Sequence, residues 1–222
     1  MSKQTTENTL SKINRLLGIG ESYKAPERIM KILEDRETYP KVFREFLIEF
    51  RYNLGYEWFL EYFEDEHADR KDRKQDFTPA GISELLAQMQ GKEPQYGIIY
   101  EPAAGTGSTI ISHWKLECAK HRFPWDYDPD HYLYICEELS ERTVPFLLFN
   151  LMIRGINAVV IHGDTLTREA QEVYHCDNRE GMMCFSKLRR LPHTARIEEL
   201  FRIKFIEKVQ GGADEQNFTD SF

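Results

Sequence analysis

The residues best suited to chemistry are two glycines in the segment 100–107, Tyr-Glu-Pro-Ala-Ala-Gly-Thr-Gly. Glycines at the carboxyl end of a strand let the backbone approach a ligand closely, and the next helix presents free N–H groups there. Gly105 and Gly107 therefore predict a site for an adenosine-type cofactor, while the alternative is a tight strand-to-helix turn without a ligand. Ile110 replaces the third glycine of a dinucleotide fingerprint, and the Gly-Lys-Ser/Thr of a phosphate-binding loop is absent.

Acidic residues close the next two predicted strands. Glu137 and Glu138 end the second strand, where a carboxylate can accept both hydroxyl protons of a ribose. The third strand ends in the sequence His-Gly-Asp-Thr at residues 162–165. Asp164 there either accepts the amino group of an adenine or caps a following helix, and both interpretations stay open.

The elements that must position these residues form an α/β pattern after residue 90. Short β-rich runs alternate with helical stretches, which predicts a parallel sheet with crossover helices. The expected strands are Ile98–Tyr100, Tyr132–Cys136, Ala158–Ile161 and Met182–Phe185. The expected helices are Thr109–Lys120 and Ser140–Arg154.

Helical periodicity dominates the region before the sheet. Two short amphipathic patterns flank the Gly-Ile-Gly turn at 18–20 and predict an appended helical hairpin. From Pro40 to Tyr62 apolar residues recur every three or four positions, which predicts one long helix that Gly55 can kink. We therefore expect a helical region over residues 1–75, an α/β domain over 76–209 and a disordered acidic tail over 210–222.

The overall composition narrows the class of protein. The 222 residues are 41% hydrophobic and 30% charged, which indicates a folded globular chain, and no apolar run approaches the ~20 residues that span a bilayer. The amino terminus lacks a secretory pattern, so we expect a cytoplasmic protein. The four cysteines form no Cys-x-x-Cys pair, which favours reduced structural thiols.

The net charge and the spacing of possible metal ligands argue against two further kinds of site. The net charge of −8 disfavours indiscriminate binding of nucleic acid, although it permits a local basic face. His113, Cys118 and His121 share a predicted helix, but their spacing spreads them around it. We therefore predict no metal site.

Three segments occur in the order found in one enzyme family. They are residues 75–79 (Gln-Asp-Phe-Thr-Pro), residues 101–107 (Glu-Pro-Ala-Ala-Gly-Thr-Gly), and Glu138 followed by Asn150 and the Gly-Ile pair at 155–156. Together they resemble the adenine-N6 DNA methyltransferases, and within that family the modification subunits of type I restriction systems. The helix before them, with Asn-Leu-Gly-Tyr-Glu at 53–57, is also similar. The resemblance covers about residues 53–166 and implies an S-adenosylmethionine-dependent methyltransferase fold, a Rossmann-like α/β sheet, here shortened.

The resemblance also implies a role for particular residues. S-adenosylmethionine would be the cofactor, with its methionine end at residues 77–79 and its amino acid moiety held by Glu101 and the backbone of 105–107. Glu138 would bind the ribose, and Asp164 the adenine. The full implied cofactor set is Phe77, Thr78, Pro79, Glu101, Ala103, Gly105, Thr106, Gly107, Glu138, Asp164 and Leu166.

The catalytic motif of that family, Asp/Asn-Pro-Pro-Tyr/Phe, has no counterpart in this chain. The nine prolines include no adjacent pair, and the segment at the expected place, 185–192, reads Phe-Ser-Lys-Leu-Arg-Arg-Leu-Pro. A lysine donates hydrogen bonds and cannot accept those of an adenine amine. The catalytic residues are therefore unassigned, and whether the chain is an enzyme stays open.

Three functions remain compatible with the sequence. The first is an adenine-specific DNA methyltransferase, or a fragment of one, working with a partner that supplies target recognition. The second is a catalytically silent relative that regulates or blocks a DNA-processing partner, and the third is a methyltransferase for another substrate. A shortened parallel sheet exposes an edge, so we expect a partner protein or self-association.

A basic segment near the carboxyl terminus is the candidate surface for nucleic acid. Residues 187–208 hold seven Lys or Arg against three Glu, and Lys187, Arg189 and Arg190 are the candidate phosphate contacts. The alternative, which we favour, is an ordinary amphipathic helix that buries four apolar residues against the sheet. Those residues are Ile197, Leu200, Phe201 and Ile203.

Overall fold

The computed structural model describes residues 8–60, 62, 96–123, 126–178 and 184–206. Its α-helices are α1 (Thr9–Leu17), α2 (Ala25–Glu34), α3 (Tyr39–Glu49), α6 (Ser108–Lys120), α7 (Val144–Ile153) and α8 (Ala195–Phe201), and its short 3-10 turns are η1 (Ser22–Lys24) and η3 (Pro129–His131). Its strands are β1 (Gly97–Glu101), β2 (Tyr132–Glu138), β3 (Ala158–Asp164), β4 (Glu169–Asp177), β5 (Lys187–Arg190) and β6 (Lys204–Phe205).

The strands form one mixed sheet in the order β1-β2-β3-β4-β5, with β6 paired to β4. Strands β1, β2 and β3 are mutually parallel, and α6 and α7 connect them. Strand β4 then runs antiparallel to both β3 and β5. The predicted α/β class and the first three parallel strands are confirmed.

The far half of the sheet differs from the expectation. The strand predicted at Met182–Phe185 is wrong over its described residues, since 184–185 are not in a strand and β5 begins at Lys187. Strand β4 was not predicted at all. Its first residues include polar side chains at 169, 171 and 172, which are typical of a loop, although the strand is buried from Val173 onward. The sheet is therefore mixed, because β4 returns from β3 through a tight turn and needs no crossover helix.

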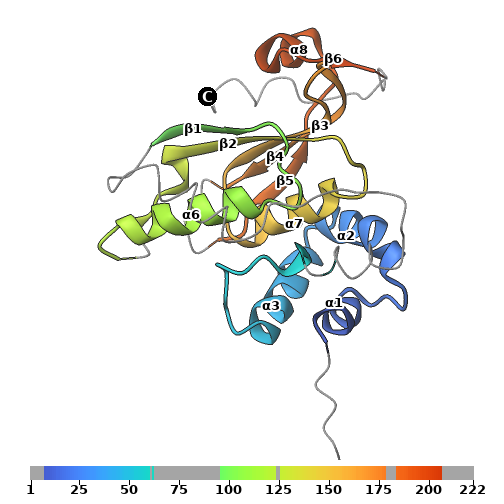
Figure 1. Ribbon diagram of the computed structural model, residues 1–222, viewed down its shortest axis with the longest axis vertical. Coiled ribbons are helices and arrows are strands. Elements are labelled where there is room, and N and C mark those ends of the chain that lie inside the picture. The colour runs from blue at the N-terminus through green and yellow to red at the C-terminus, as the bar shows by residue number, and fades with distance from the viewer. Residues whose placement is uncertain (1–7, 61, 63–95, 124–125, 179–183, 207–222) are drawn as a thin grey trace, which may run out of the picture.

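All the α-helices except α8 lie in two layers on one face of the sheet (Figure 1). Helices α6 and α7 cover the sheet directly, and α1, α2 and α3 pack beyond them. One hydrophobic core joins all these elements, so the amino-terminal helices share the core of the sheet. Helix α8 lies on the opposite face, where Ile197 and Phe201 pack against β3 and β4. Ile203 is buried as expected, but Leu200 is half exposed, which corrects the prediction that it faces the sheet.

The helical hairpin predicted at the amino terminus is confirmed. Asn8 caps α1 by accepting a hydrogen bond from the Ser11 N–H at 2.8 Å, and Gly18 ends the helix in the left-handed conformation that a glycine adopts without strain. Helix α2 begins with a proline in its first turn and buries Ile29 and Leu33.

The single long helix expected from Pro40 to Tyr62 is wrong. Helix α3 ends at Glu49, and Arg51 and Tyr52 both have positive φ values, 54° and 56°. The break leaves the carbonyls of Leu54 and Tyr56 free, and the buried Arg154 guanidinium donates to both at 2.7 Å. The apolar residues that suggested one helix are still buried or partly buried against the core, so periodicity alone did not reveal the break.

Candidate cofactor site

The glycine loop joins the end of β1 to the start of α6, as the sequence predicts. Gly105 and Gly107 have φ values of 56° and 100°, a region that side chains with a Cβ adopt only under strain. A Cβ on Gly107 would lie 3.1 Å from Leu147 Cδ1. Glycine is thus needed at 107 both for its backbone conformation and for its closeness to α7.

The loop stays attached to the neighbouring strand after β1 has ended. The Ala104 N–H donates to the Glu137 carbonyl at 2.9 Å, so the backbone of the loop continues alongside β2. The Thr165 hydroxyl donates to the Pro102 carbonyl at 2.7 Å, which joins the loop to the end of β3. The ends of all three parallel strands therefore meet at this loop.

Glu138 holds the glycine loop directly. Its Oε2 accepts the Gly105 N–H at 2.9 Å, and its Oε1 accepts the Ser140 N–H at 2.8 Å. The side chain is only 6% exposed, and burial raises its pKa, while the hydrogen bonds from the backbone act in the opposite direction. The acid and the loop, predicted from separate parts of the sequence, are in contact.

The other predicted positions at this edge are less enclosed. Glu101 Oε2 accepts the Thr109 hydroxyl at 2.8 Å, and Ala103 is exposed. Asp164 Oδ1 accepts the Leu166 N–H at 2.8 Å within the turn from β3 to β4, so the predicted alternative of a helix cap is wrong. The Leu166 side chain is 92% exposed. The remaining predicted positions, Phe77, Thr78 and Pro79, lie outside the described residues.

A buried polar network below the loop was not predicted. Asn150 Nδ2 donates to the Thr106 carbonyl at 2.8 Å and to Glu57 Oε1 at 2.7 Å. Arg154 Nη1 donates to Asn150 Oδ1 at 2.9 Å, and its guanidinium lies 4.7 Å from the centre of the Trp58 ring. Asn150 and Glu57 both belong to segments of the family resemblance, but nothing in the sequence indicated that they meet.

The electrostatics of this network are unusual. Burial raises the pKa of the Glu57 carboxyl group, which hydrogen bonds and the nearby Arg154 partly offset. Burial lowers the pKa of Arg154 to about 9. Burying either charge alone costs free energy of desolvation, and the attraction between Glu57 and Arg154 reduces that cost for both groups.

Glu137 faces the opposite side of the sheet from Glu138 and has a separate partner. Arg168 Nη1 lies 2.8 Å and 2.7 Å from its two carboxylate oxygens, and Tyr100 donates to Oε1 at 2.9 Å. Arg168 Nη2 also donates to the Phe201 carbonyl at 2.9 Å, which links β2 to the end of α8. Glu137 is therefore engaged structurally, which leaves Glu138 as the acid of the loop.

The chain matches the family model described as N-6 DNA Methylase over residues 53–184, more than half of its length. The protein belongs to the N-6 DNA methylase family. The matched residues include β1, the glycine loop, Glu138, the Asn150 network and Asp164. The predicted family is thereby confirmed.

Comparisons with solved structures and with curated proteins give two further results. A solved type I restriction-modification system methyltransferase subunit from Streptococcus thermophilus is similar, at 14% sequence identity and a TM-score of 0.37. The similarity covers 71% of this chain and 51% of that one, so the chain spans about half the length of that structure. No curated protein matches the chain.

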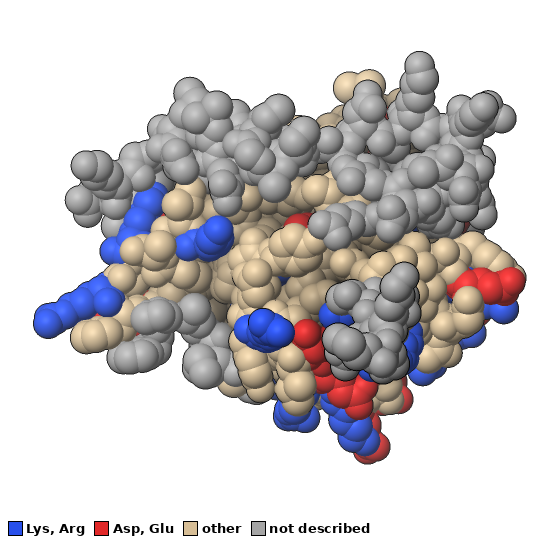
Figure 2. Space-filling model, turned by 60° about the horizontal axis from the view of Figure 1, so that its bottom comes forward, with Lys and Arg blue, Asp and Glu red and all other residues tan. Residues whose placement is uncertain are grey.

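The predicted nucleic-acid contacts lie on β5 and are largely paired with acids. Arg189 lies 2.9 Å from Asp177, and Arg190 lies 2.9 Å from Glu34. Lys187 is exposed at the start of the strand. On the face formed by the amino-terminal helices, the described basic side chains stand in separate groups rather than one continuous surface (Figure 2). A phosphate contact through these three residues stays a prediction.

The described residues contain neither a membrane-spanning helix nor a metal site. No helix there is long and apolar enough to cross a bilayer. No group of three or more His, Cys, Asp or Glu side chains in the same part of the chain is arranged to hold a metal ion. All four cysteines are free thiols.

Proposed function

We propose that this N-6 DNA methylase relative binds S-adenosylmethionine at the carboxyl ends of β1, β2 and β3 and acts with DNA and a partner subunit. The observation that carries the proposal is the contact between Glu138 and the Gly105 N–H at 2.9 Å. It joins an acid suited to ribose hydroxyls to a loop of the kind that approaches a cofactor closely.

The residues at this edge fit the groups of such a cofactor. Glu101, Glu138 and Asp164 supply carboxylates at the ends of three adjacent strands, suited to an ammonium group, ribose hydroxyls and an adenine amino group. Thr106 Oγ1 is buried and has no hydrogen-bond partner among the described residues. Helix α6 begins at Ser108, and its N-cap residue Gly107 offers no side-chain cap, so the first N–H groups of the helix are available to a ligand.

In the bound state the cofactor supplies an activated methyl group, and the protein holds and orients it. Glu138 accepts the Gly105 N–H at Oε2 and the Ser140 N–H at Oε1, and because a carboxylate has about four lone-pair sites, acceptor capacity remains for a ribose hydroxyl. Protonation of Glu138 removes acceptor capacity, and burial raises its pKa. We therefore expect the affinity for S-adenosylmethionine to fall as the pH is lowered toward that pKa.

A catalytically silent role in regulating or blocking a DNA-processing partner is the second candidate function. The observation that favours it is the absence of any adjacent proline pair in the 222 residues, which rules out the Asp/Asn-Pro-Pro-Tyr/Phe motif in this chain. A flipped adenine needs acceptors for its amine and an aromatic ring for stacking. The segment that would follow the expected fourth strand instead forms the basic strand β5.

The test is a calorimetric titration of the full chain with S-adenosylmethionine, followed by a methyl-transfer assay on mixed-sequence DNA. We expect binding by the natural chain and a loss of about tenfold or more in Glu138→Gln, since a hydrogen bond to a charged group contributes about 1.5–3 kcal/mol. Glu199→Gln is the matched control, because it removes one exposed carboxylate on α8.

The outcomes separate the two candidate functions. Binding with methyl transfer supports the enzyme, whereas binding without transfer supports the silent relative. If S-adenosylmethionine does not bind the folded chain, or if Glu138→Gln binds it as tightly as Glu199→Gln, the cofactor assignment is wrong. Circular dichroism of each variant checks that the fold is retained.

A further inference from the structure

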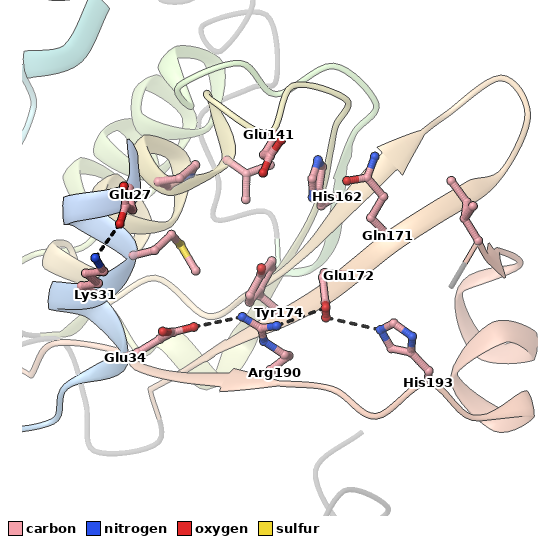
Figure 3. A pocket seen from close by; sticks show the side chains of 14 residues that line it. Glu27, Lys31, Glu34, Glu141, His162, Gln171, Glu172, Tyr174, Arg190 and His193 are labelled. Carbon is pink, nitrogen blue, oxygen red and sulfur yellow. Dashed lines mark hydrogen bonds and ion pairs between the residues drawn. The ribbon is translucent and has the colours of Figure 1, made fainter. Parts of the chain in front are cut away.

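A second pocket lies apart from the glycine loop, between α2, the start of α7 and the strands β3, β4 and β5 (Figure 3). It has a volume of about 610 Å³, within the range of pockets that hold small organic ligands. Met30, Val144 and Pro145 give it an apolar side. Neither Glu138 nor Asp164 lines it, so it is distinct from the candidate cofactor site.

The two permanent cations of this pocket are already paired with carboxylates. Lys31 Nζ contacts Glu27 Oε1 within α2. Arg190 Nη2 lies 2.9 Å from Glu34 Oε1, and its Nη1 lies 3.1 Å from Glu172 Oε1. Figure 3 shows these ion pairs along the margin of the pocket. An anionic ligand would have to displace them, which disfavours a phosphate or carboxylate ligand.

A buried hydrogen-bond acceptor lies on the other side of the pocket. His162 is only 5% exposed, and its Nε2 has no hydrogen-bond partner among the described residues. Burial lowers the pKa of His162, so its ring is neutral at pH 7, and the other ring nitrogen donates its N–H to the Leu139 carbonyl. Nε2 is then left with a lone pair that no described residue satisfies, and a group that donates a hydrogen bond would satisfy it.

A carboxylate accompanies this acceptor. Glu141 is exposed and forms no ion pair with a described residue, and in Figure 3 it lies on the same side of the pocket as His162. The lining as a whole contains four glutamates against one lysine and one arginine. The acceptors of the pocket that lack a partner among the described residues, His162 Nε2 and the Glu141 carboxylate, therefore favour a ligand that is positively charged and carries N–H donors.

We propose that this pocket binds a small aliphatic amine. Its ammonium group would lie between the Glu141 carboxylate and His162 Nε2, and its methylene chain along the side formed by Met30, Val144 and Pro145. An ammonium has three donors and one charge, which matches one neutral and one charged acceptor. The site is independent of cofactor binding, because it shares no residue with the glycine loop or its acid.

The test is a calorimetric titration of the full chain with 1,5-diaminopentane, with 1,5-pentanediol as a ligand of equal length without charge. We expect the diamine to bind and the diol not to bind. Glu141→Gln should weaken diamine binding about tenfold, the effect of losing one charge-assisted hydrogen bond. Glu199→Gln is the matched control, since it lowers the charge equally on α8, outside this pocket.

Two further variants complete the test of this pocket. His162→Phe keeps a flat ring without the acceptor, and it should also weaken the diamine, provided that circular dichroism shows a native fold. Glu138→Gln should bind the diamine as the natural chain does. Equal binding of the diol, or unchanged binding in Glu141→Gln, overturns the proposal.

Competition identifies other occupants. Displacement of the diamine by S-adenosylmethionine would assign the pocket to the cofactor site and overturn a separate amine site. A lysine amide blocked at both backbone ends carries the same ammonium group. If this compound bound more tightly than the diamine, the ligand would be the lysine side chain of a protein, and the proposal of a free amine would be overturned.

Discussion

The Asn150 side-chain amide donates a hydrogen bond to the Thr106 carbonyl at 2.8 Å, so α7 holds the glycine loop from below. The same amide nitrogen donates to Glu57 Oε1 at 2.7 Å. One side chain thus connects the loop to the amino-terminal region, 93 residues away in sequence. We expect the position of the loop to depend on this contact, since Asn150 is fully buried.

Asn150→Ala should destabilise the protein and weaken cofactor binding. The substitution removes the hydrogen bond to the Thr106 carbonyl, and it also removes the hydrogen bond that the buried Glu57 carboxyl group accepts from Asn150. Unpairing buried polar and charged groups costs about 2–4 kcal/mol, which chemical denaturation would measure as a lower free energy of unfolding. Asn53→Ala, at an exposed position, is the control. Equal stability of the two variants would contradict a structural role for Asn150.

Arg154→Lys should loosen the chain between α3 and Trp58 although the charge is kept. Arg154 donates to the Leu54 and Tyr56 carbonyls at 2.7 Å, and a lysine cannot reproduce the planar fork that reaches both. We expect faster amide hydrogen exchange over residues 50–57 and a loss of about 2–3 kcal/mol, because a hydrogen-bonded buried charge is disturbed. Arg44→Lys, on the exposed face of α3, should leave both quantities unchanged.

The burial of Glu57 predicts a particular dependence of stability on pH. Because burial raises its pKa above 4.5 in the native state, the unfolded state releases this proton first as the pH rises. The Glu57 contribution to the free energy of unfolding therefore falls as the pH rises through the interval between the two pKa values. Denaturation at about pH 5 and about pH 7 should show Glu57→Gln gaining stability relative to the natural chain at the higher pH.

A suitable comparison for that pH effect is Glu27→Gln. Lys31 lowers the pKa of Glu27, so the titration of Glu27 in the native state lies below its value in the unfolded chain. Its main effect on stability then falls below about pH 5 and has the opposite sign. A Glu57→Gln difference that stays constant at every pH above about 4.5 would contradict the raised pKa of Glu57.

Gly107→Ala should damage the loop more than a substitution at another glycine. The residue has a φ of 100°, and the added Cβ would lie 3.1 Å from Leu147 Cδ1. Left-handed backbone costs about 1–2 kcal/mol for a residue with a Cβ, so thermal denaturation should show a lower midpoint, and calorimetry a weaker affinity for S-adenosylmethionine. Gly20→Ala meets open space and serves as the control. If Gly107→Ala matched Gly20→Ala in both measurements, the loop would not need glycine at this position.

Much of the fold was predictable because the signals were local. The glycine loop, the ends of the first three strands and both amino-terminal helices follow from residues close to each other in sequence. The contact between Glu138 and Gly105 was accessible too, since parallel neighbouring strands bring their carboxyl ends to one edge. Strand β4 was not predicted because its first, largely exposed residues are polar, as in a loop.

The sequence by itself determined that this chain is an N-6 DNA methylase relative with a glycine loop and a nearby acid, and that it lacks the adjacent prolines of the catalytic motif. Only the tertiary structure decided that α3 ends at Glu49, that Asn150 joins Glu57 to the loop, and that Glu141 and His162 share a second pocket. The physical reason is the range of the interactions. Backbone propensities act between neighbours in sequence, whereas buried polar groups are satisfied by whichever partner the packing brings within hydrogen-bond distance.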